Sequence, residues 1–295
     1  MEVYVTFWGT RGSIPTPGYR TARYGGNTAC VEISTDRTLI ICDAGTGIRE
    51  LGLDMLNRRA RHEVGHMFFS HAHWDHIQGF PFFPPVYMES MSFYVYSADS
   101  NKEIFNLLSG QMKSQYFPVR FSDLRARIEP RNIGDCGNRV DDFEVRCIEL
   151  NHPGGATGYS FSTGNLKIAY LSDNELDQVL EEPESALKDP SAPRKVPDRF
   201  FHFVNGARLL IADGQYTDQE YPQKVGWGHS RATTLVDLAV AAGVEQLAIT
   251  HHDPLQSDEM VDEKIDACRR RAKMLGRDDL VVFGAREGIQ LLLEA

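Results

Sequence analysis

The feature that most constrains this chain is a cluster of metal-binding residue types directly after a short apolar segment. Only ten histidines occur in 295 residues, yet three of them fall within positions 71–76, beside an aspartate. The cluster reads His71-Ala72-His73-Trp74-Asp75-His76 and follows apolar residues 67–69, which predict a buried strand. Burying so many polar side chains without a partner ion would be costly. The pattern therefore predicts a metal site where this strand ends, with a solvated His-rich turn as the alternative.

The spacing inside the cluster suits two metal ions. His71 and His73 lie two positions apart, so on extended backbone they project from the same face and can share one ion. Asp75 and His76 come after a turn and can bind a second ion. Mixed imidazole and carboxylate ligands suit borderline cations, so we predict two divalent ions, with zinc favoured and manganese or iron as alternatives.

Hydrophobic periodicity predicts alternating strands and helices along the whole chain. Strands are expected at residues 3–8, 28–34, 39–42, 67–69, 92–97, 143–150, 158–162, 166–171, 208–212, 246–250 and 280–283, the last being the final strand. Helices are expected from about 45 to 59 and at 102–108, 232–242 and 258–275, with Ser230 as a candidate N-cap. Because no repeat or linker interrupts the pattern, we predict one α/β domain over residues 1–295. An irregular loop region is expected at about 110–130 and a surface insertion at about 182–197.

Charge and composition argue against several classes of protein. The formal net charge is −10, whereas proteins that bind long nucleic acids normally carry a basic stripe, so a small substrate is favoured. No apolar run of 18 residues could span a membrane, and the first residues lack the features of a secretory signal. Five scattered cysteines without a C-x-x-C pair predict reduced thiols and a cytoplasmic location.

The H-x-H-x-D-H run after an apolar strand resembles the signature of the metallo-β-lactamase superfamily, whose members are αββα sandwiches with metals at the strand ends. The other motifs expected of that family follow in its order along nearly the whole chain. They are Asp43 in CDAG, His152 after the strand at 143–150, Asp173 at the end of KIAYLSD and His251 after QLAIT.

The resemblance implies a role for each of these residues. His71, His73 and His152 would bind one metal ion, Asp75, His76 and His251 would bind the other, and Asp173 would bridge the two. His252 is the alternative to His251 as the last ligand. Asp43 is expected to orient a ligand, and Asp213 is either another such residue or the alternative bridge.

Several further segments resemble the phosphodiesterase branch of the superfamily, which includes ribonuclease Z and cyclic-nucleotide phosphodiesterases. They are GTRGSIPTPG, DAGTGIREL, YLSD, GHSRATTLVDLA and LAITHHDP. Relatives carry a His-Ser/Thr pair where this chain has His229-Ser230, and a histidine there can protonate a leaving alkoxide. Capping or packing is the alternative role for His229. Relatives in this branch are often dimers, so a homodimer is an open alternative.

The resemblance implies hydrolysis of a small phosphodiester, foremost a cyclic nucleotide, by attack of a metal-bridging hydroxide on phosphorus. Asp75 would orient the hydroxide and His229 would act as general acid. A nucleobase could stack on one of the aromatic residues after the cluster or in the irregular loop, for which ordinary packing is the alternative. They are Phe80, Phe82, Phe83, Tyr87, Tyr116 and Phe117. The alternative functions are a thioester or lactone hydrolase of the same fold, which would not need His229, and an RNA endonuclease similar to ribonuclease Z.

Overall fold

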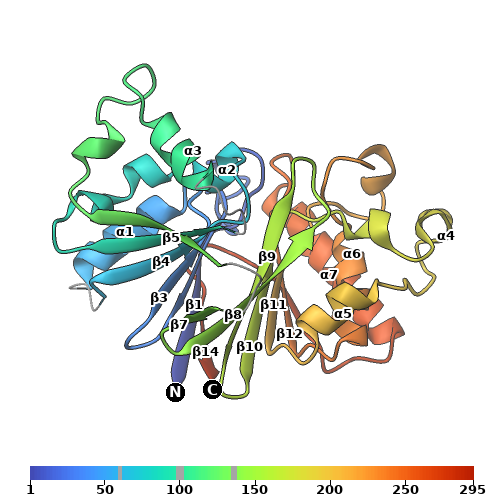
Figure 1. Cartoon of the computed structure of the whole chain (residues 1–295). Helices are drawn as coiled ribbons and strands as arrows, with labels where there is room; N and C mark the ends of the chain where they lie inside the picture. The colour runs from blue at the N-terminus through green and yellow to red at the C-terminus, as the bar shows by residue number, and fades with distance from the viewer. Residues whose placement is uncertain (59–61, 98–102, 134–137) are drawn as a thin grey trace.

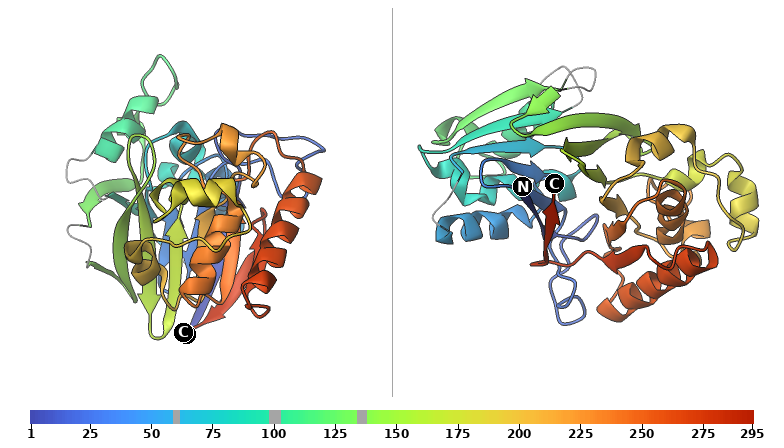
Figure 2. Two further views of the ribbon diagram at one scale, coloured as in Figure 1. Left: turned by 90° about the vertical axis from the view of Figure 1, so that its right-hand side faces the viewer. Right: turned by 90° about the horizontal axis from the view of Figure 1, so that it is seen from below.

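Two seven-stranded sheets lie face to face between two layers of helices (Figure 1), and Figure 2 shows the same layers from two further directions. The structure is a computed structural model that describes residues 1–58, 62–97, 103–133 and 138–295. The first sheet has the order β14 (Gln290–Glu294), β1 (Glu2–Gly9), β2 (Cys30–Ser34), β3 (Leu39–Cys42), β4 (Val64–Phe68), β5 (Ser92–Ser97) and β6 (Arg127–Asn132). The second has the order β13 (Val281–Gly284), β12 (Gln246–Thr250), β11 (Leu209–Asp213), β10 (Leu166–Leu171), β9 (Ala156–Thr163), β8 (Phe143–Leu150) and β7 (Asn138–Val140).

The α-helices lie outside the two sheets and at their edges. They are α1 (Ile48–Asn57), α2 (Trp74–Ile77), α3 (Glu103–Gln111), α4 (Pro183–Lys188), α5 (Asp198–Val204), α6 (Ala232–Ala241) and α7 (Asp258–Met274). In Figure 1, α1 and α3 lie beside the first sheet, and α5, α6 and α7 lie beside the second. This arrangement confirms the predicted αββα sandwich.

Three apolar clusters hold these layers together. One lies between α1 and the first sheet, one between the two sheets, and one between the second sheet and the helices α5, α6 and α7. Phe68 of β4 shows how the sheets interlock. Its ring stacks on Tyr96 at 4.5 Å and meets Tyr159 and Phe161 of the opposite sheet edge-on at 5.3 and 5.1 Å. The buried faces of the alternating strands therefore form one continuous interior.

Several strand predictions are confirmed to the residue, and one was wrong. The strands at 39–42, 92–97, 143–150, 166–171 and 246–250 have the expected bounds. The strand near 280 is not the last, because β14 follows it and pairs antiparallel with β1. Only Leu293 of β14 is buried, so this edge strand lacks the apolar alternation that predicts a strand. The short strand β7 and the helix α5 were also not predicted.

Ser230 does not cap helix α6, contrary to the prediction. The N-cap is Arg231, and no side chain caps that helix end. The hydroxyl of Ser230 instead donates to the carbonyl of Asn174 at 2.5 Å and accepts from the backbone N–H of Leu176 at 3.0 Å. Ser230 thus ties the start of α6 to the segment that follows β10.

The two irregular regions contain some regular structure. Residues 110–130 include the end of α3, a 3₁₀ turn at Phe121–Asp123 and the start of β6. Residues 182–197 include α4 and the buried Arg194, whose guanidinium donates to the hydroxyls of Thr233 and Thr234 on α6. Their roles as a functional loop and a surface insertion stay predictions.

The cysteines depart in part from the expectation of reduced thiols. Cys30, Cys42 and Cys268 are free and buried, but Cys147 is disulfide-bonded, and Cys136 lies outside the described residues. A thiol count cannot reveal which cysteines the fold brings together. Within the described ranges, no helix is both long and apolar enough to cross a membrane.

Candidate metal centre

The candidate site residues follow the ends of strands in both sheets. Asp43 follows β3, His71 follows β4, His152 follows β8, Asp173 follows β10, Asp213 ends β11 and His251 follows β12. Strand β3 runs parallel to β4, and β10, β11 and β12 run parallel to one another, so their carboxyl ends meet at one edge. Helix α2 begins at Trp74 and carries Asp75 and His76 to the same edge. The fold thereby gathers residues that lie as far apart in the sequence as Asp43 and His251.

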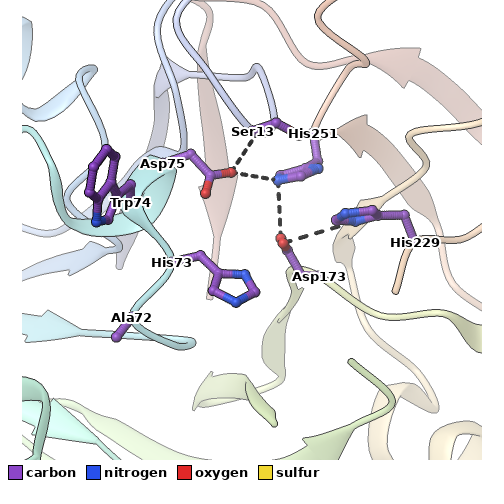
Figure 3. Close-up of a pocket in the computed structure, with 8 residues that line it drawn as sticks. All are labelled: Ser13, Ala72, His73, Trp74, Asp75, Asp173, His229 and His251. Carbon is purple, nitrogen blue, oxygen red and sulfur yellow. Dashed lines mark hydrogen bonds and ion pairs between the residues drawn. The ribbon is translucent and has the colours of Figure 1, made fainter. Parts of the chain in front are cut away.

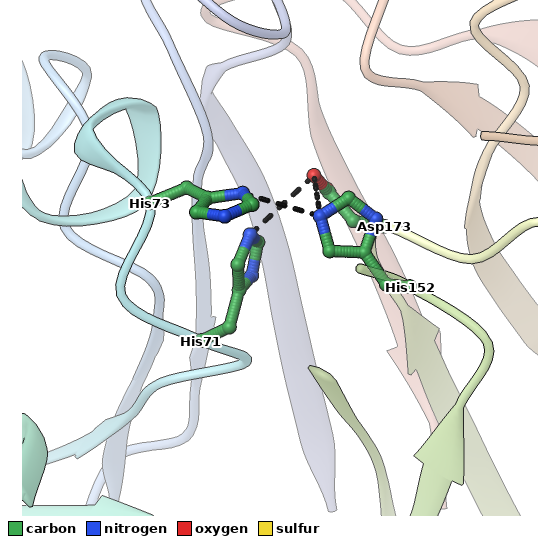
Figure 4. A group of neighbouring side chains, drawn as sticks. All are labelled: His71, His73, His152 and Asp173. Carbon is green, nitrogen blue, oxygen red and sulfur yellow. Dashed lines mark hydrogen bonds and ion pairs between the residues drawn. The ribbon is translucent and has the colours of Figure 1, made fainter. Parts of the chain in front are cut away.

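Three histidines and one aspartate form the first group of potential ligands (Figure 4). They are His71, His73, His152 and Asp173, and one ligand atom of each lies within 4.8 Å of all the others. The Nε2 atom of His152 is 3.1 Å from Nδ1 of His73. The Nε2 atoms of His71 and His152 are 3.6 and 3.7 Å from Oδ2 of Asp173.

The second group consists of buried residues, Asp75, His76, Asp173 and His251. The Nε2 atom of His76 lies 3.2 Å from a carboxylate oxygen of Asp75 and 3.2 Å from Oδ1 of Asp173. The Nε2 atom of His251 lies 3.1 Å from Asp75 Oδ2 and 3.2 Å from the same Oδ1 of Asp173. Each histidine therefore faces both aspartates.

Asp173 belongs to both groups, and its two oxygens divide between them. Oδ2 faces His71 and His152, whereas Oδ1 faces His76 and His251. This is the placement that a carboxylate bridging two ions would have. Asp213 belongs to neither of these two groups, but it forms a third cluster of potential ligands with Asp173, His229 and His251.

The donor atoms have the spacing expected around bound ions. Zinc–ligand bonds of about 2.0–2.1 Å place neighbouring ligands of a tetrahedral site roughly 3.4 Å apart. The distances above lie between 3.1 and 3.7 Å. The buried Nε2 atoms of His71 and His76 also have no hydrogen-bond partner among the described residues, a costly state for a polar atom. Two bound cations would satisfy both, so the residues fit a pair of divalent ions.

Neighbouring histidines of the cluster have pKa values shifted in opposite directions, as expected for a site built to hold cations. Burial, together with the neighbouring His76, lowers the pKa of His71 to about 2. Burial would also lower the pKa of His76, but the charges of Asp173, Asp75 and Asp43 raise it well above the usual range. A site with imidazoles and carboxylates this close favours an added positive charge, and a metal ion can supply it in place of protons.

Asp43 contacts the cluster through hydrogen bonds but is not one of the potential ligands. Its Oδ2 accepts from the Nδ1 of His76 at 2.9 Å, from Tyr170 at 2.7 Å and from the hydroxyl of Ser70 at 2.8 Å. The hydrogen bond to Nδ1 leaves Nε2 of His76 directed at the second group. Asp43 is held in a left-handed backbone conformation with φ of 62°.

His251 lies in the cluster, and His252 does not. The Nδ1 of His251 lies 2.9 Å from Oε1 of Gln215, and its backbone φ is 57°. The ring of His252 points away, with Nε2 donating to the carbonyl of Ala285 at 3.0 Å and the ring in an edge-to-face contact with Tyr24 at 5.3 Å. Of the two adjacent histidines, His251 is therefore the one whose Nε2 can reach a metal.

His229 stands at the wall of the cluster and is paired with Asp213. Its Nδ1 is 2.8 Å from Oδ2 of Asp213 and 3.9 Å from Oδ2 of Asp173. Burial opposes protonation, but the charge and hydrogen bond of Asp213 raise the pKa of His229 to about 9. The hydrogen bond at Nδ1 directs Nε2 away from Asp213, so His229 can hold a proton for a bound molecule.

Sequence reasoning missed Glu175, which fixes the loop that carries His229. Its buried carboxylate accepts from the hydroxyl of Tyr221 at 2.8 Å and from the N–H groups of Gly226 and Gly228, each at 2.7 Å. Gly228 has φ of 90°, and a Cβ there would overlap the ring of His152. The loop is thus held by the segment that starts at Asp173.

A pocket of about 470 Å³ opens onto the cluster (Figure 3). It is lined by Ser13, Ala72, His73, Trp74, Asp75, Asp173, His229 and His251. The N–H of Ser13 donates to Oδ2 of Asp75 at 2.7 Å, and Ser13 itself has φ of 64°. Ser13 and Trp74 were not predicted at the site. Both lie in motifs singled out above, but their orientation depends on contacts between distant segments.

The aromatic residues suggested for base stacking lie elsewhere. Phe80 and Phe83 are fully buried, and Phe82 packs edge-on against Phe117 at 5.2 Å. Tyr116 is exposed, but neither it nor the phenylalanines line the pocket. Ordinary packing, the alternative given above, describes the buried phenylalanines.

Comparison with protein families gives a match over residues 38–252, which is more than half of the chain, to the family described as the β-lactamase superfamily domain. A curated ribonuclease Z of Natronomonas pharaonis is 26% identical over 286 residues, covering 85% of this chain and 87% of that protein. The ribonuclease Z of Haloarcula marismortui is 24% identical over 304 residues, covering 90% and 92%.

Solved structures share the fold at lower identity. The metallo-β-lactamase fold protein YhfI from Bacillus subtilis is similar with a TM-score of 0.67 and 17% identity, covering 99% of each chain. A diphosphatase from the PhnP family has a TM-score of 0.66 and 16% identity over 99% of this chain and 98% of that chain. The short form of human tRNase Z has a TM-score of 0.64 and 16% identity over 98% of each chain.

Proposed function

Because the chain belongs to the β-lactamase superfamily, as the family match over residues 38–252 shows, we propose that this hydrolase acts on a small phosphodiester, with cyclic nucleotides as the leading candidates. The seven side chains of the two groups would hold two divalent cations, for which zinc best suits the imidazole-rich donors. When bound, such a pair supplies a water activated near neutral pH and stabilises charge on a phosphate oxygen.

The main observation in favour of a phosphodiester substrate is the pairing of His229 with Asp213 at the pocket wall. A departing alkoxide needs a proton, and a positioned imidazolium can donate one from Nε2 while Asp213 holds Nδ1. Asp75, whose carboxylate also lines the pocket, is proposed to orient the attacking water. A site that cleaves only thioesters or lactones would not need the general acid.

The size and charge of the pocket favour a small substrate. A volume of about 470 Å³ lies within the range of small-molecule sites, and none of the lining residues is a lysine or arginine. With a formal net charge of −10 over the chain, a long polyanion would be repelled on average. A nucleotide with one phosphodiester is small enough for the pocket and carries too little charge for strong repulsion.

Cleavage of RNA precursors is the second candidate. It is favoured by curated ribonuclease Z relatives, two of which match most of this chain at 26% and 24% identity. A basic patch outside the pocket would be required to hold such a substrate against the overall charge.

One substrate panel separates these candidates. The metal-loaded protein should be assayed on bis(p-nitrophenyl) phosphate, cyclic mononucleotides, cyclic dinucleotides, precursor tRNA and a thioester. We expect hydrolysis of the first and of at least one cyclic nucleotide. Efficient cleavage of precursor tRNA at physiological salt would favour the second candidate, and activity confined to the thioester would contradict both.

A further inference from the structure

Trp74 is an exposed indole at the mouth of the candidate metal centre. It is the first residue of α2, between the potential ligands His73 and Asp75, and 80% of its surface is exposed. Exposure alone does not distinguish it, because Tyr19 and Tyr116 are similarly exposed, but Trp74 also lines the pocket. Because its neighbours on both sides face the cluster, Trp74 is held at the site rather than on a distant surface.

The three tryptophans of the chain differ in what covers their rings. Trp8 donates from Nε1 to Glu32 at 2.9 Å and lies beneath the guanidinium of Arg58. Trp227 carries the ammonium of Lys224 3.8 Å from its ring centroid. The backbone carbonyl of Trp74 accepts from the N–H of Gln78 at 2.7 Å, but its indole makes no hydrogen bond, ring stacking or cation contact with the residues that the structure describes. It is the tryptophan whose faces are open to a ligand.

The position of Trp74 relative to the reacting groups also suits a substrate contact. In Figure 3, Trp74 and His229 stand on opposite sides of the pocket, with His73 and Asp173 between them. In a cyclic nucleotide with its phosphate at the cluster and its leaving oxygen toward His229, the base would extend from the same ribose, and the indole of Trp74 is the ring of the pocket lining on which it could stack. Every nucleobase presents a π-face that such an indole can stack on.

We propose that Trp74 is a base-stacking platform, and that the substrate is therefore a nucleotide rather than a phosphodiester without a base. The proposal rests on the proposed function for the nature of the scissile bond, but the stacking itself can be measured without turnover. It makes Trp74 a residue that sets affinity and substrate class. Stacking of one base on an aromatic side chain stabilises complexes by about 1–3 kcal/mol, or roughly 5- to 150-fold in affinity.

Intrinsic fluorescence tests the stacking directly. The variant Trp8→Phe/Trp227→Phe retains Trp74 as its one tryptophan and should be titrated, metal-loaded, with adenosine 5′-monophosphate. We expect saturable quenching, and none with ribose 5-phosphate, which lacks the base. The matched variant Trp8→Phe/Trp74→Phe, which retains Trp227, should show no saturable quenching. Quenching that persists in this variant, or that ribose 5-phosphate also produces, would overturn the proposal.

Kinetics on a hydrolysed cyclic nucleotide give the second test. Trp74→Ala should raise KM by about 5- to 150-fold with little change in kcat, and Trp74→Phe should restore most of the loss. Metal content of both variants must match the parent, because the neighbouring residues are potential ligands. If Trp74→Ala hydrolyses the cyclic nucleotide with the KM of the parent, the proposal that Trp74 stacks on the base is wrong. Base-dependent quenching without hydrolysis of any phosphodiester would instead leave the platform in place and overturn the proposed function.

Discussion

The Nδ1 atom of His229 lies 2.8 Å from a carboxylate oxygen of Asp213, although the two residues lie in different parts of the fold. Asp213 ends a strand of the second sheet, and His229 lies in the loop before α6. The pair places a proton donor beside the potential metal ligands, with Nδ1 of His229 3.9 Å from Oδ2 of Asp173. The first two predictions follow from this arrangement.

Replacing His229 by alanine should slow phosphodiester hydrolysis in a way that depends on the leaving group. With a ribose-type leaving oxygen, kcat should fall about 10²- to 10⁴-fold, the usual worth of a positioned proton donor. With a p-nitrophenyl ester the loss should be much smaller, because phenolate leaves without a proton. Steady-state kinetics on both substrates measure the contrast. Equal losses would reduce His229 to a structural residue and favour the thioester and lactone alternatives.

The activity of the parent enzyme should depend on pH through the proton of His229. Asp213 raises the pKa of this histidine to about 9, so the donor is protonated below that pH and lost as pH rises through it. Bound cations act in the opposite direction, so the expected result is a relative one. Asp213→Asn should move the alkaline limb of the kcat profile to lower pH. A limb at the same pH in both proteins would show that another group titrates.

Asp173→Ala should loosen both metal ions together, because its two oxygens face different ligand groups. Elemental analysis after dialysis should find about two ions per chain in the parent and far fewer than one in the variant. Asp213→Asn is the matched control, since Asp213 lies in neither group, and should keep both ions. Loss of a single ion from Asp173→Ala would mean that the bridge lies elsewhere.

Lys264 should make the protein more stable as pH rises above neutrality. This buried amine on α7 donates to Gln256 at 2.8 Å and to the carbonyl of Gln215 at 3.1 Å, and burial lowers its pKa from 10.5 to about 8. The folded state therefore releases the proton before the unfolded state does. The free energy of unfolding should then rise between about pH 8 and 10.5, by about 2 kcal/mol at pH 9.5 relative to pH 7.

Comparison with Lys264→Met isolates this contribution, since other titrating groups are common to both proteins. Urea unfolding at pH 7 and pH 9.5 should show a larger gain in stability for the parent than for the variant. An identical response to pH would mean that Lys264 is already neutral at pH 7, or solvated in the folded state.

Several of the potential ligands could be predicted from sequence because they follow the ends of strands. His71, His152, Asp173 and His251 all have this context, and parallel strands bring such positions to one edge. The choice between His251 and His252 needed the structure. Both follow the same strand, and only the backbone conformation decides which ring turns inward.

Residues that act through long-range contacts could not be predicted. Glu175 has no motif of its own, and its role depends on a loop about fifty residues later. Trp74 was visible inside the motif, but exposure is a tertiary property that no local pattern reports. Ser230 was predicted to cap a helix from its position alone, but its hydroxyl instead donates to the carbonyl of Asn174 in the segment after β10.

The left-handed backbone at Asp43 and His251 has a consequence for the evolution of this enzyme. Non-glycine residues in that region of conformational space carry a strain of order 1–3 kcal/mol. Glycine would relieve the strain at either position and remove a side chain that orients or forms the candidate metal centre. At Asp43 this relief is offset by the buried hydrogen bonds that His76, Tyr170 and Ser70 would lose. A population selected for heat resistance alone, without a demand for turnover, should therefore change His251 before Asp43. The same two positions should resist change wherever catalysis is required.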